Sequence, residues 1–289
     1  MLVATAVLVG SCAQQSSPSA QSNTTRDTGT TEAREAPPAA RGLEWASVLS
    51  DLGLTDPSAS RWETVYATGF ESDDDLAGFY QTPPSPLTRH EVVEGVERHG
   101  GRRAHRGWLT GSTGAEPVDG PNHRGYPTIQ LHKRPTGPCR AVCLVDLWVR
   151  LEGARLGTGE WFSLATFSTD GSDRWSRVAL ANVGSEGWLH TFHVPTHGVG
   201  GWTFQRRDLP FPRDRWVRVT TLLDMRPAGG AVAVWQDGAL MSAARFEGGD
   251  GDLDQMHFGL YAPESLVDAS VWNDDITVLQ QRDPVAGRS

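Results

Sequence analysis

The stretch Trp216-Val217-Arg218-Val219-Thr220-Thr221-Leu222-Leu223 decides the class of fold. Its valines alternate with Arg218 and Thr220, and this period of two places successive side chains on opposite faces of a β-strand. Gln236-Asp237-Gly238-Ala239 separates two further runs of this kind, and Asp-Gly is a strong signal for a tight hairpin turn. The pattern therefore predicts strands that pair with antiparallel neighbours.

Short β-rich runs, split by Gly, Pro, Asp and Asn, continue from Glu63 onward. Helical spacing appears in one place, where Leu43, Ala46 and Leu49 precede Gly53. There is no alternation of strands with helices and no repeat of about 20–50 residues. The predicted strands are 64–70, 87–94, 102–109, 125–132, 143–152, 160–168, 175–183, 187–194, 215–224, 231–237, 239–246, 256–262 and 270–280. We predict an all-β antiparallel two-sheet sandwich over 63–282, a short helical segment in 42–62 that packs on it, and a disordered tail at 283–289.

The composition excludes several classes of protein. The chain has 289 residues, and 26 Lys plus Arg against 35 Asp plus Glu give a net charge of −9. No basic face for nucleic acid is expected, and no apolar run approaches the roughly 18 residues of a membrane span. The chain has 11 Trp, and every basic residue except Lys133 is Arg. These favour aromatic platforms and carboxylate binding, although core filling and a GC-rich genome explain them as well.

The amino terminus predicts a destination. Residues 1–11 are short and apolar, and Leu8-Val9-Gly10-Ser11-Cys12 resembles a bacterial lipobox, in which the Cys becomes lipid-modified. Residues 13–41 are rich in Ser, Thr, Gln, Ala and Pro, as in a disordered tether. We predict a signal peptide ending at Cys12, export, and a lipoprotein on the bacterial cell envelope that meets the membrane only through its lipid anchor. A plain cleaved signal peptide with an incidental Cys is the alternative.

The other two cysteines, Cys139 and Cys143, are candidates for a disulfide in an oxidising compartment. Four positions along a straight strand would place their Cα atoms about 13 Å apart, which is too far for a bond. The bond therefore requires a turn, which Gly137-Pro138 is able to supply. The residue pattern alone leaves the disulfide open.

Four segments resemble concanavalin A-like lectin and glucanase jelly rolls. They are Gly69-Phe70-Glu71-Ser72, Val234-Trp235-Gln236-Asp237-Gly238, His257-Phe258-Gly259-Leu260-Tyr261 and Trp272-Asn273-Asp274-Asp275-Ile276-Thr277-Val278. The resemblance covers about 65–280 and implies a jelly-roll sandwich in which a curved sheet forms a groove for glycans. It does not establish an activity, because one fold carries many functions.

Within this superfamily the chain is most similar to alginate-lyase-like polysaccharide lyases. Arg124-Gly125-Tyr126-Pro127-Thr128-Ile129-Gln130-Leu131-His132 stands where that family has an Arg-rich strand, and Gly259-Leu260-Tyr261 where it has a Tyr-bearing strand. The family's Gln-x-His strand would fall at 161–167, which has neither residue, and Gln130-Leu131-His132 spells the triplet one strand too early. The resemblance implies that the catalytic candidates are Tyr261, His132, Arg124 and Gln130.

Elimination on a uronate requires a group that neutralises the carboxylate, a base and an acid. Arg124 and Gln130 are candidates for the first role, because an Arg fork binds carboxylates, and Tyr261 for acid or base. The candidate bases are His132, His190 and His193.

The period of two places Tyr126, Thr128, Gln130 and His132 on one face, as expected of a strand that lines a groove and equally of any half-exposed strand. His190 and His193 should point to opposite faces, which argues against a shared metal ion. Trp188 and Trp202 are candidates for stacking on sugar rings. The predicted substrate-binding residues are Tyr126, Thr128, His190, His193, Trp188 and Trp202.

Carboxylates near the first and last strands suggest a structural ion. Related jelly rolls often hold Ca²⁺, and the candidate ligands here are Glu71, Asp274 and Asp275. A solvated acidic turn is the alternative, and it also accounts for Asp73-Asp74-Asp75.

Three functions remain open at this point. The leading one is binding of an extracellular polysaccharide, with the Arg bias favouring an acidic one. The second is a polysaccharide lyase, and the third a non-catalytic envelope or adhesion module with a protein partner. We expect a monomer. The paired-carboxylate strand of the superfamily's glucanases, of Glu-x-Asp-x-x-Glu type, does not occur, which argues against a retaining hydrolase.

Overall fold

The computed structural model describes residues 42–54, 61–76, 80–81, 87–95, 99–111, 122–194 and 201–282. They belong to one compact unit, Ala39–Ser289. Cys12, the signal peptide, the tether and the tail at 283–289 lie outside the described residues, so their predictions stay predictions. Within the described part, no helix is long and apolar enough to cross a membrane.

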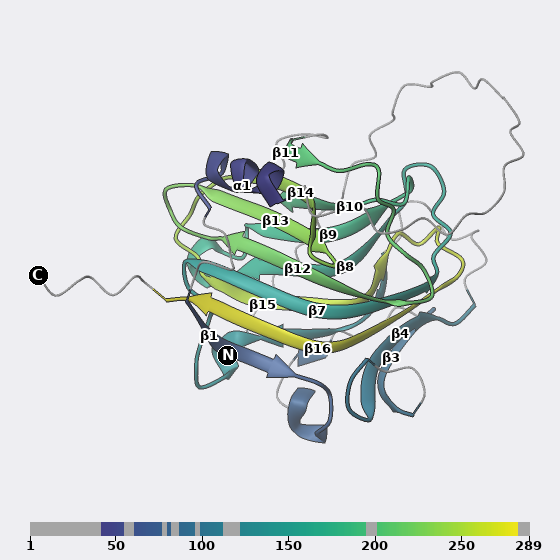
Figure 1. Ribbon diagram of the computed structural model, residues 1–289. Coiled ribbons are helices and arrows are strands. Elements are labelled where there is room, and N and C mark those ends of the chain that lie inside the picture. Colours follow the sequence, from purple (N-terminus) through teal and green to yellow (C-terminus); the bar gives the residue numbers. More distant parts are fainter. Residues whose placement is uncertain are drawn as a thin grey trace, which may run out of the picture. The chain divides into compact units, whose positions relative to one another are not determined.

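Two antiparallel sheets form a sandwich (Figure 1). The first sheet has the order β11-β14-β13-β12-β7-β16-β4-β3, with β1 also paired to β16. Its strands are β1 (Trp62–Thr68), β3 (Thr88–Glu94), β4 (Arg103–Leu109), β7 (Val142–Gly153), β11 (Trp202–Gln205), β12 (Trp216–Asp224), β13 (Gly230–Gln236), β14 (Ala239–Phe246) and β16 (Ala269–Gln281). This architecture confirms the predicted all-β sandwich.

The second sheet has the order β10-β9-β8-β15-β6-β2, with β5 also paired to β15. Its strands are β2 (Tyr80–Gln81), β5 (His123–Gly125), β6 (Pro127–Gln130), β8 (Trp161–Thr169), β9 (Val178–Gly184), β10 (Leu189–Val194) and β15 (Leu253–Ala262). The described helices are α1 (Gly42–Asp51) and the 3-10 turns η2 (Asp73–Leu76), η3 (Leu131–Lys133) and η4 (Gly171–Asp173).

Alternating side chains fill the core between the sheets. In β7, Val145, Leu147, Val149 and Leu151 are fully buried, whereas the residues between them are only partly buried. They share one cluster with aromatic and aliphatic side chains of β8 and β15. The period of two in the sequence thus becomes one buried and one outward face per strand.

The helix α1 covers part of the outer face of the first sheet, over β13 and β14 (Figure 1). Its Leu49 packs in a second cluster with Leu222, Ala233 and Trp235. An outward Leu222 on β12 is buried for this reason, because without α1 it would face water. A short helix in this region confirms the prediction.

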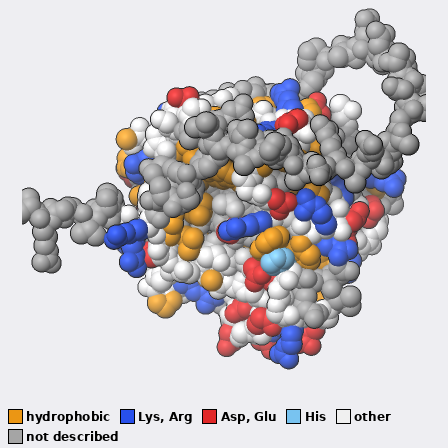
Figure 2. All heavy atoms as spheres, in the orientation of Figure 1, with side chains coloured by type: hydrophobic (Ala, Val, Ile, Leu, Met, Phe, Trp, Pro, Cys, Tyr) orange, Lys and Arg blue, Asp and Glu red, His pale blue; other side chains and the backbone are white. Residues whose placement is uncertain are grey.

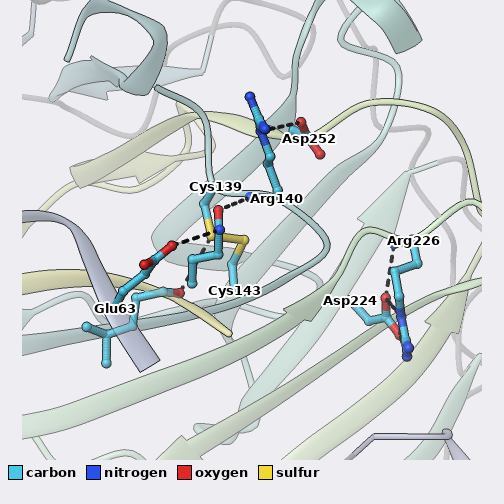
Figure 3. Close-up of a disulfide and its surroundings, with 9 residues drawn as sticks. Glu63, Cys139, Arg140, Cys143, Asp224, Arg226 and Asp252 are labelled. Carbon is cyan, nitrogen blue, oxygen red and sulfur yellow. Dashed lines mark hydrogen bonds and ion pairs between the residues drawn. A yellow bond between two sulfur atoms is a disulfide. The ribbon is translucent and has the colours of Figure 1, made fainter. Parts of the chain in front are cut away.

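A disulfide joins Cys139 to Cys143 (Figure 3), with the two Cα atoms 6.1 Å apart. Cys139 forms an isolated bridge to Leu253, and the chain then reverses at Ala141, whose φ is +56°, before β7 begins. Because of this reversal, the two Cα atoms lie closer together than the roughly 13 Å expected along a straight strand. The sulfur atoms lie in the core, since both cysteines are fully buried.

Removing this disulfide should destabilise the chain by a modest amount. The bond closes a loop with a sequence separation of 4, and the loop-entropy argument gives about 2 kcal/mol for so short a loop. We expect the double variant Cys139→Ala, Cys143→Ala to unfold about 2 kcal/mol more easily in a denaturant titration. A reductant should destabilise the unsubstituted chain and leave the double variant unchanged. Equal effects of reductant on both chains would contradict the bond.

Candidate functional site

A row of polar side chains crosses the outer face of the second sheet. Arg124 on β5 lies opposite Tyr261 on β15, which lies opposite Ser163 on β8. Ser163 lies opposite Asn182 on β9, and Asn182 opposite His190 on β10. Because directly opposite residues of antiparallel strands share a face, all five side chains belong to one surface. Residues from four widely separated parts of the sequence are brought together in this row.

Tyr261 is enclosed by three other rings. Its ring centroid lies 5.6 Å from Tyr126, 5.2 Å from His257 and 5.0 Å from Trp161, each in an edge-on arrangement. The imidazole of His257 stacks on Tyr126 at 3.9 Å with an angle of 11° between the rings. We call Tyr126, His257, Tyr261 and Trp161 the aromatic cluster. This cluster of packed rings distinguishes the outer face of the second sheet from an ordinary half-exposed sheet face.

A glycine allows the aromatic cluster to form. Gly259 lies between His257 and Tyr261 at an irregularity in the pairing of β15 with β8, and its φ is +112°. A Cβ atom there would lie 2.7 Å from the carbonyl oxygen of Gly125. Another residue would force β15 away from β5 and separate Tyr261 from Arg124.

Two polar atoms of this face are buried and have no hydrogen-bond partner among the described residues. They are Nε of Arg124 and Oδ1 of Asn182. The Tyr261 hydroxyl accepts a hydrogen bond from Nδ2 of Asn122 at 3.2 Å. A buried polar group without a partner costs free energy, so the face is suited to a ligand that supplies donors and acceptors.

The histidines of the face are neutral. Burial, followed by the nearby charge of Arg124, lowers the pKa of His257 from 6.5 to about 3. Burial also lowers the pKa of His190 to about 4, against a smaller opposing effect of the Trp188 carbonyl. At neutral pH both imidazoles therefore act as uncharged hydrogen-bonding and stacking groups.

The predicted catalytic residues are only partly brought together. Arg124 and Tyr261 are direct neighbours, but Gln130 lies opposite Gln255, six residues along β15 from Tyr261. At about 3.4 Å per residue, that separation is roughly 20 Å. Gln130 thus lies on the same face of the sheet as Arg124 but far from it along the strands.

The structure corrects the expected place of His132. β6 ends at Gln130, and His132 lies in η3, so it does not continue the alternation of Tyr126 and Thr128. Asp254 holds it there: its Oδ1 accepts the His132 backbone N–H at 2.8 Å, and its Oδ2 lies 2.6 Å from Nδ1.

The predicted histidines and tryptophans near β10 divide between two faces. His190 lies in the polar row, whereas His193 is 5% exposed, on the inner side near Phe246. Trp202 lies edge-on to His190 at 5.5 Å, and its Nε1 donates to the Thr191 carbonyl. The guanidinium of Arg207 covers the ring of Trp188 at 5.3 Å, so that ring offers less stacking surface than expected.

His257 is a site residue that the sequence analysis missed. It stands two alternations before Tyr261 within a segment already singled out for the fold. Counting the period of two backward from Tyr261 would have placed His257 on the same face. Trp161, at the start of β8, carried no such signal.

The outer face of the first sheet is also aromatic, but its rings are occupied within the protein. His99 stacks on Trp148 at 3.7 Å, and Arg106 lies between Trp108 and Trp272 at 5.0 and 4.8 Å. Figure 2 shows hydrophobic, basic and acidic side chains and a histidine gathered on this face. The second sheet carries Arg124 and Tyr261, two of the predicted site residues, as direct neighbours, and it is therefore the candidate site.

Two of the candidate calcium ligands, Glu71 and Asp274, accept hydrogen bonds from backbone N–H groups, and the third, Asp275, contacts a histidine ring. Glu71 Oε1 accepts from Arg102 and Arg103 at 2.6 and 2.9 Å, and Asp274 Oδ2 accepts from His99 and Gly100 at 3.0 and 2.8 Å. Asp275 Oδ2 lies 2.7 Å from His99 Nδ1. Among the residues that the structure describes, no group of three His, Cys, Asp or Glu could hold a metal. This arrangement does not fit a metal centre, and calcium binding stays a prediction.

No family model and no curated protein matches the sequence. Solved structures similar to this chain include a cellulose-induced protein (15% identity, 73% of this chain and 95% of that chain, TM-score 0.45). They also include an alginate lyase from a Chlorella virus (11% identity, 66% and 89%, TM-score 0.45) and a carbohydrate-binding module from Bacillus subtilis (11% identity, 76% and 95%, TM-score 0.33). At such identities these likenesses concern the fold alone.

Proposed function

We propose that this chain binds a polysaccharide along the outer face of the second sheet. The observation that carries the proposal is the aromatic cluster beside Arg124. Aromatic rings stack on the apolar faces of sugar rings, and glycan and ligand sites combine such surfaces with a few placed polar groups. Arg124, Tyr261 and His190 of the polar row are half-buried and supply such groups, whereas Ser163 and Asn182 are buried.

Arg124 favours a polysaccharide that carries carboxylates. Its Nε is buried and without a partner among the described residues, and a guanidinium fork binds a carboxylate through two parallel hydrogen bonds. A uronate residue seated beside Tyr261 would satisfy Arg124 and stack on the cluster at once. The polymer is therefore proposed to be acidic.

The proposed setting is outside the cell. The lipobox at Cys12 and the polar tether at 13–41 support an exported lipoprotein that holds this domain, as a monomer, at the surface of the cell envelope. Polysaccharides of that environment would then reach the face without crossing a membrane.

Elimination is the alternative reaction at this face, and the titrating groups disfavour it. A general base works best with a pKa near the ambient pH. His257 and His190 have pKa values of about 3 and about 4, so neither accepts a proton readily. His132 lies beyond the end of β6 and is held by Asp254, which precedes Tyr261 by seven residues in β15. Binding is the function that this geometry supports best.

Trp161 and Arg124 should both be required for binding of polygalacturonate. We expect Trp161→Ala and Arg124→Gln each to weaken binding about tenfold, or about 1.4 kcal/mol, in affinity gel electrophoresis. Binding of dextran, which is neutral, should be weakened by Trp161→Ala but not by Arg124→Gln.

Trp175 provides a matched control. It is 42% exposed and lies after η4 in the β8–β9 connection, at the opposite end of β8 from Trp161. Trp175→Ala should leave the retardation unchanged. If Trp175→Ala weakens binding as much as Trp161→Ala, or if no polysaccharide is retarded while a protein partner is captured, glycan binding at this face is wrong.

The unsubstituted chain should produce no unsaturated uronate ends. With no imidazole whose pKa lies near neutrality beside Tyr261, we expect the ultraviolet absorbance of a polyuronate solution to stay flat over hours. A steady rise that Tyr261→Phe removes would reverse this assignment and establish the lyase alternative.

Acid should destabilise the fold through His257. The folded pKa, about 3, lies below the ordinary value of 6.5, so between these limits the unfolded chain binds a proton that the folded chain refuses. Stability contributed by the neutral ring is complete above pH 6.5 and falls as the pH drops. From pH about 7.5 to about 5, the loss due to one such histidine is at most about 2 kcal/mol. We expect His257→Gln to reduce the acid-induced loss in denaturant titrations at the two pH values. An unchanged loss would contradict the burial of a neutral His257.

A further inference from the structure

A cavity lies at one end of the sandwich, and none of its lining residues belongs to the polar row or the aromatic cluster. It occupies about 460 Å³ among the segments that follow β7 and β9 and precede β12 and β16. Its polar side chains come from Arg155, Ser185, Arg213, Asp214 and Asp268. The cavity therefore offers two cationic groups, two carboxylates and a hydroxyl.

Arg213 is the unusual member of this set. Its Nη1 is buried and has no hydrogen-bond partner among the described residues. Burial lowers the pKa of the guanidinium, and the nearby charge of Asp214 only partly opposes this. A buried guanidinium N–H without an acceptor costs free energy that a bound anion would recover.

The walls of the cavity are held in place by the backbone. The N–H of Ala154 donates to the Asp268 carbonyl at 2.7 Å, and the N–H of Asp214 donates to the Leu151 carbonyl at 2.9 Å. Gly153 has a φ of +63°, and a Cβ atom there would lie 2.9 Å from Oδ2 of Asp268. The backbone of Asp268 is thus held against β7, and its exposed carboxylate lies close to Gly153.

The mixture of charges selects the ligand. A small inorganic anion would meet Arg213 but also the repulsion of two carboxylates, and it has no hydroxyl donors to offset that repulsion. A neutral sugar would offer Nη1 of Arg213 only a hydroxyl oxygen, which is a weaker acceptor than a carboxylate. A ligand with one carboxylate and several hydroxyl donors satisfies both kinds of group, because Asp carboxylates accept hydrogen bonds from hydroxyls.

We propose that this cavity binds a single uronate residue, with its carboxylate on Arg213 and its hydroxyls donating to Asp214 and Asp268. Arg155, which is exposed at the rim, adds a second positive charge. The site uses none of the residues of the polar row or the aromatic cluster, so it goes beyond the binding face proposed above.

The test is isothermal titration calorimetry of the full chain with sodium glucuronate, glucose and sodium sulfate. Glucuronate should bind at least tenfold more tightly than glucose or sulfate. Arg213→Gln should weaken glucuronate binding at least tenfold, and Arg213→Lys, which keeps the charge but loses the fork, should weaken it less. Arg215→Gln is the matched control, because Arg215 is two residues away and pairs with Asp237 at 2.9 Å. Thermal unfolding of each variant shows whether it is folded.

Three outcomes would overturn the proposal. Equal glucuronate affinity in Arg213→Gln and in the unsubstituted chain would remove Arg213 from the site. Equal affinity for sulfate and glucuronate would exclude the role of the hydroxyls. Loss of binding in Arg124→Gln, with Arg213→Gln unaffected, would assign the sugar to the face of the second sheet and support the proposed function alone.

Discussion

The pairing of β16 with β7 is the interaction on which the rest of the structure depends. Its register runs from Ala269 opposite Gly153 to Gln280 opposite Cys143, so the last strand of the chain lies in the middle of the first sheet. One end of this β16–β7 pairing adjoins the disulfide, and the other adjoins the cavity that we propose binds a uronate. Between them an irregularity at Asp274 allows its carboxylate to accept two backbone N–H groups, which anchors the segment before β4. A single long antiparallel pairing thus positions features that are far apart in sequence.

The architecture was predictable because it depends on local patterns. Two short-range features predict the same structure in most proteins. One is the alternation of side chains in β12, and the other is the turn at Asp237 and Gly238, two residues with positive φ. The disulfide was not predictable on that basis, since it requires a left-handed Ala141, a residue that carries no turn signal. His132 was misplaced for a similar reason. Asp254, which is 122 positions away, captures it through two hydrogen bonds that local alternation does not reveal.

The sequence predicted which residues form the candidate site better than it predicted their chemistry. Arg124 and Tyr261 followed from the resemblance, and the register of β5 with β15 does place them opposite one another. The properties that decide between binding and elimination are the pKa values of His257 and His190, which depend on burial by side chains from several strands. Burial disfavours the charged imidazole, and it does so in proportion to tertiary packing. No spacing in the sequence encodes this quantity.

The arginines give a final argument about ligands. Arg103, Arg134 and Arg150 each engage an acidic side chain or a carbonyl through one of their guanidinium nitrogens. Arg124 and Arg213 each have a buried guanidinium nitrogen without a partner, and no side-chain hydrogen bond or ion pair to any described residue. In a chain with 35 acidic residues and a net charge of −9, intramolecular partners for two guanidinium groups are plentiful. Arg213 lies beside Asp214 and Arg124 lies opposite Tyr261, and each keeps a buried donor that an external carboxylate is able to satisfy at a proposed site.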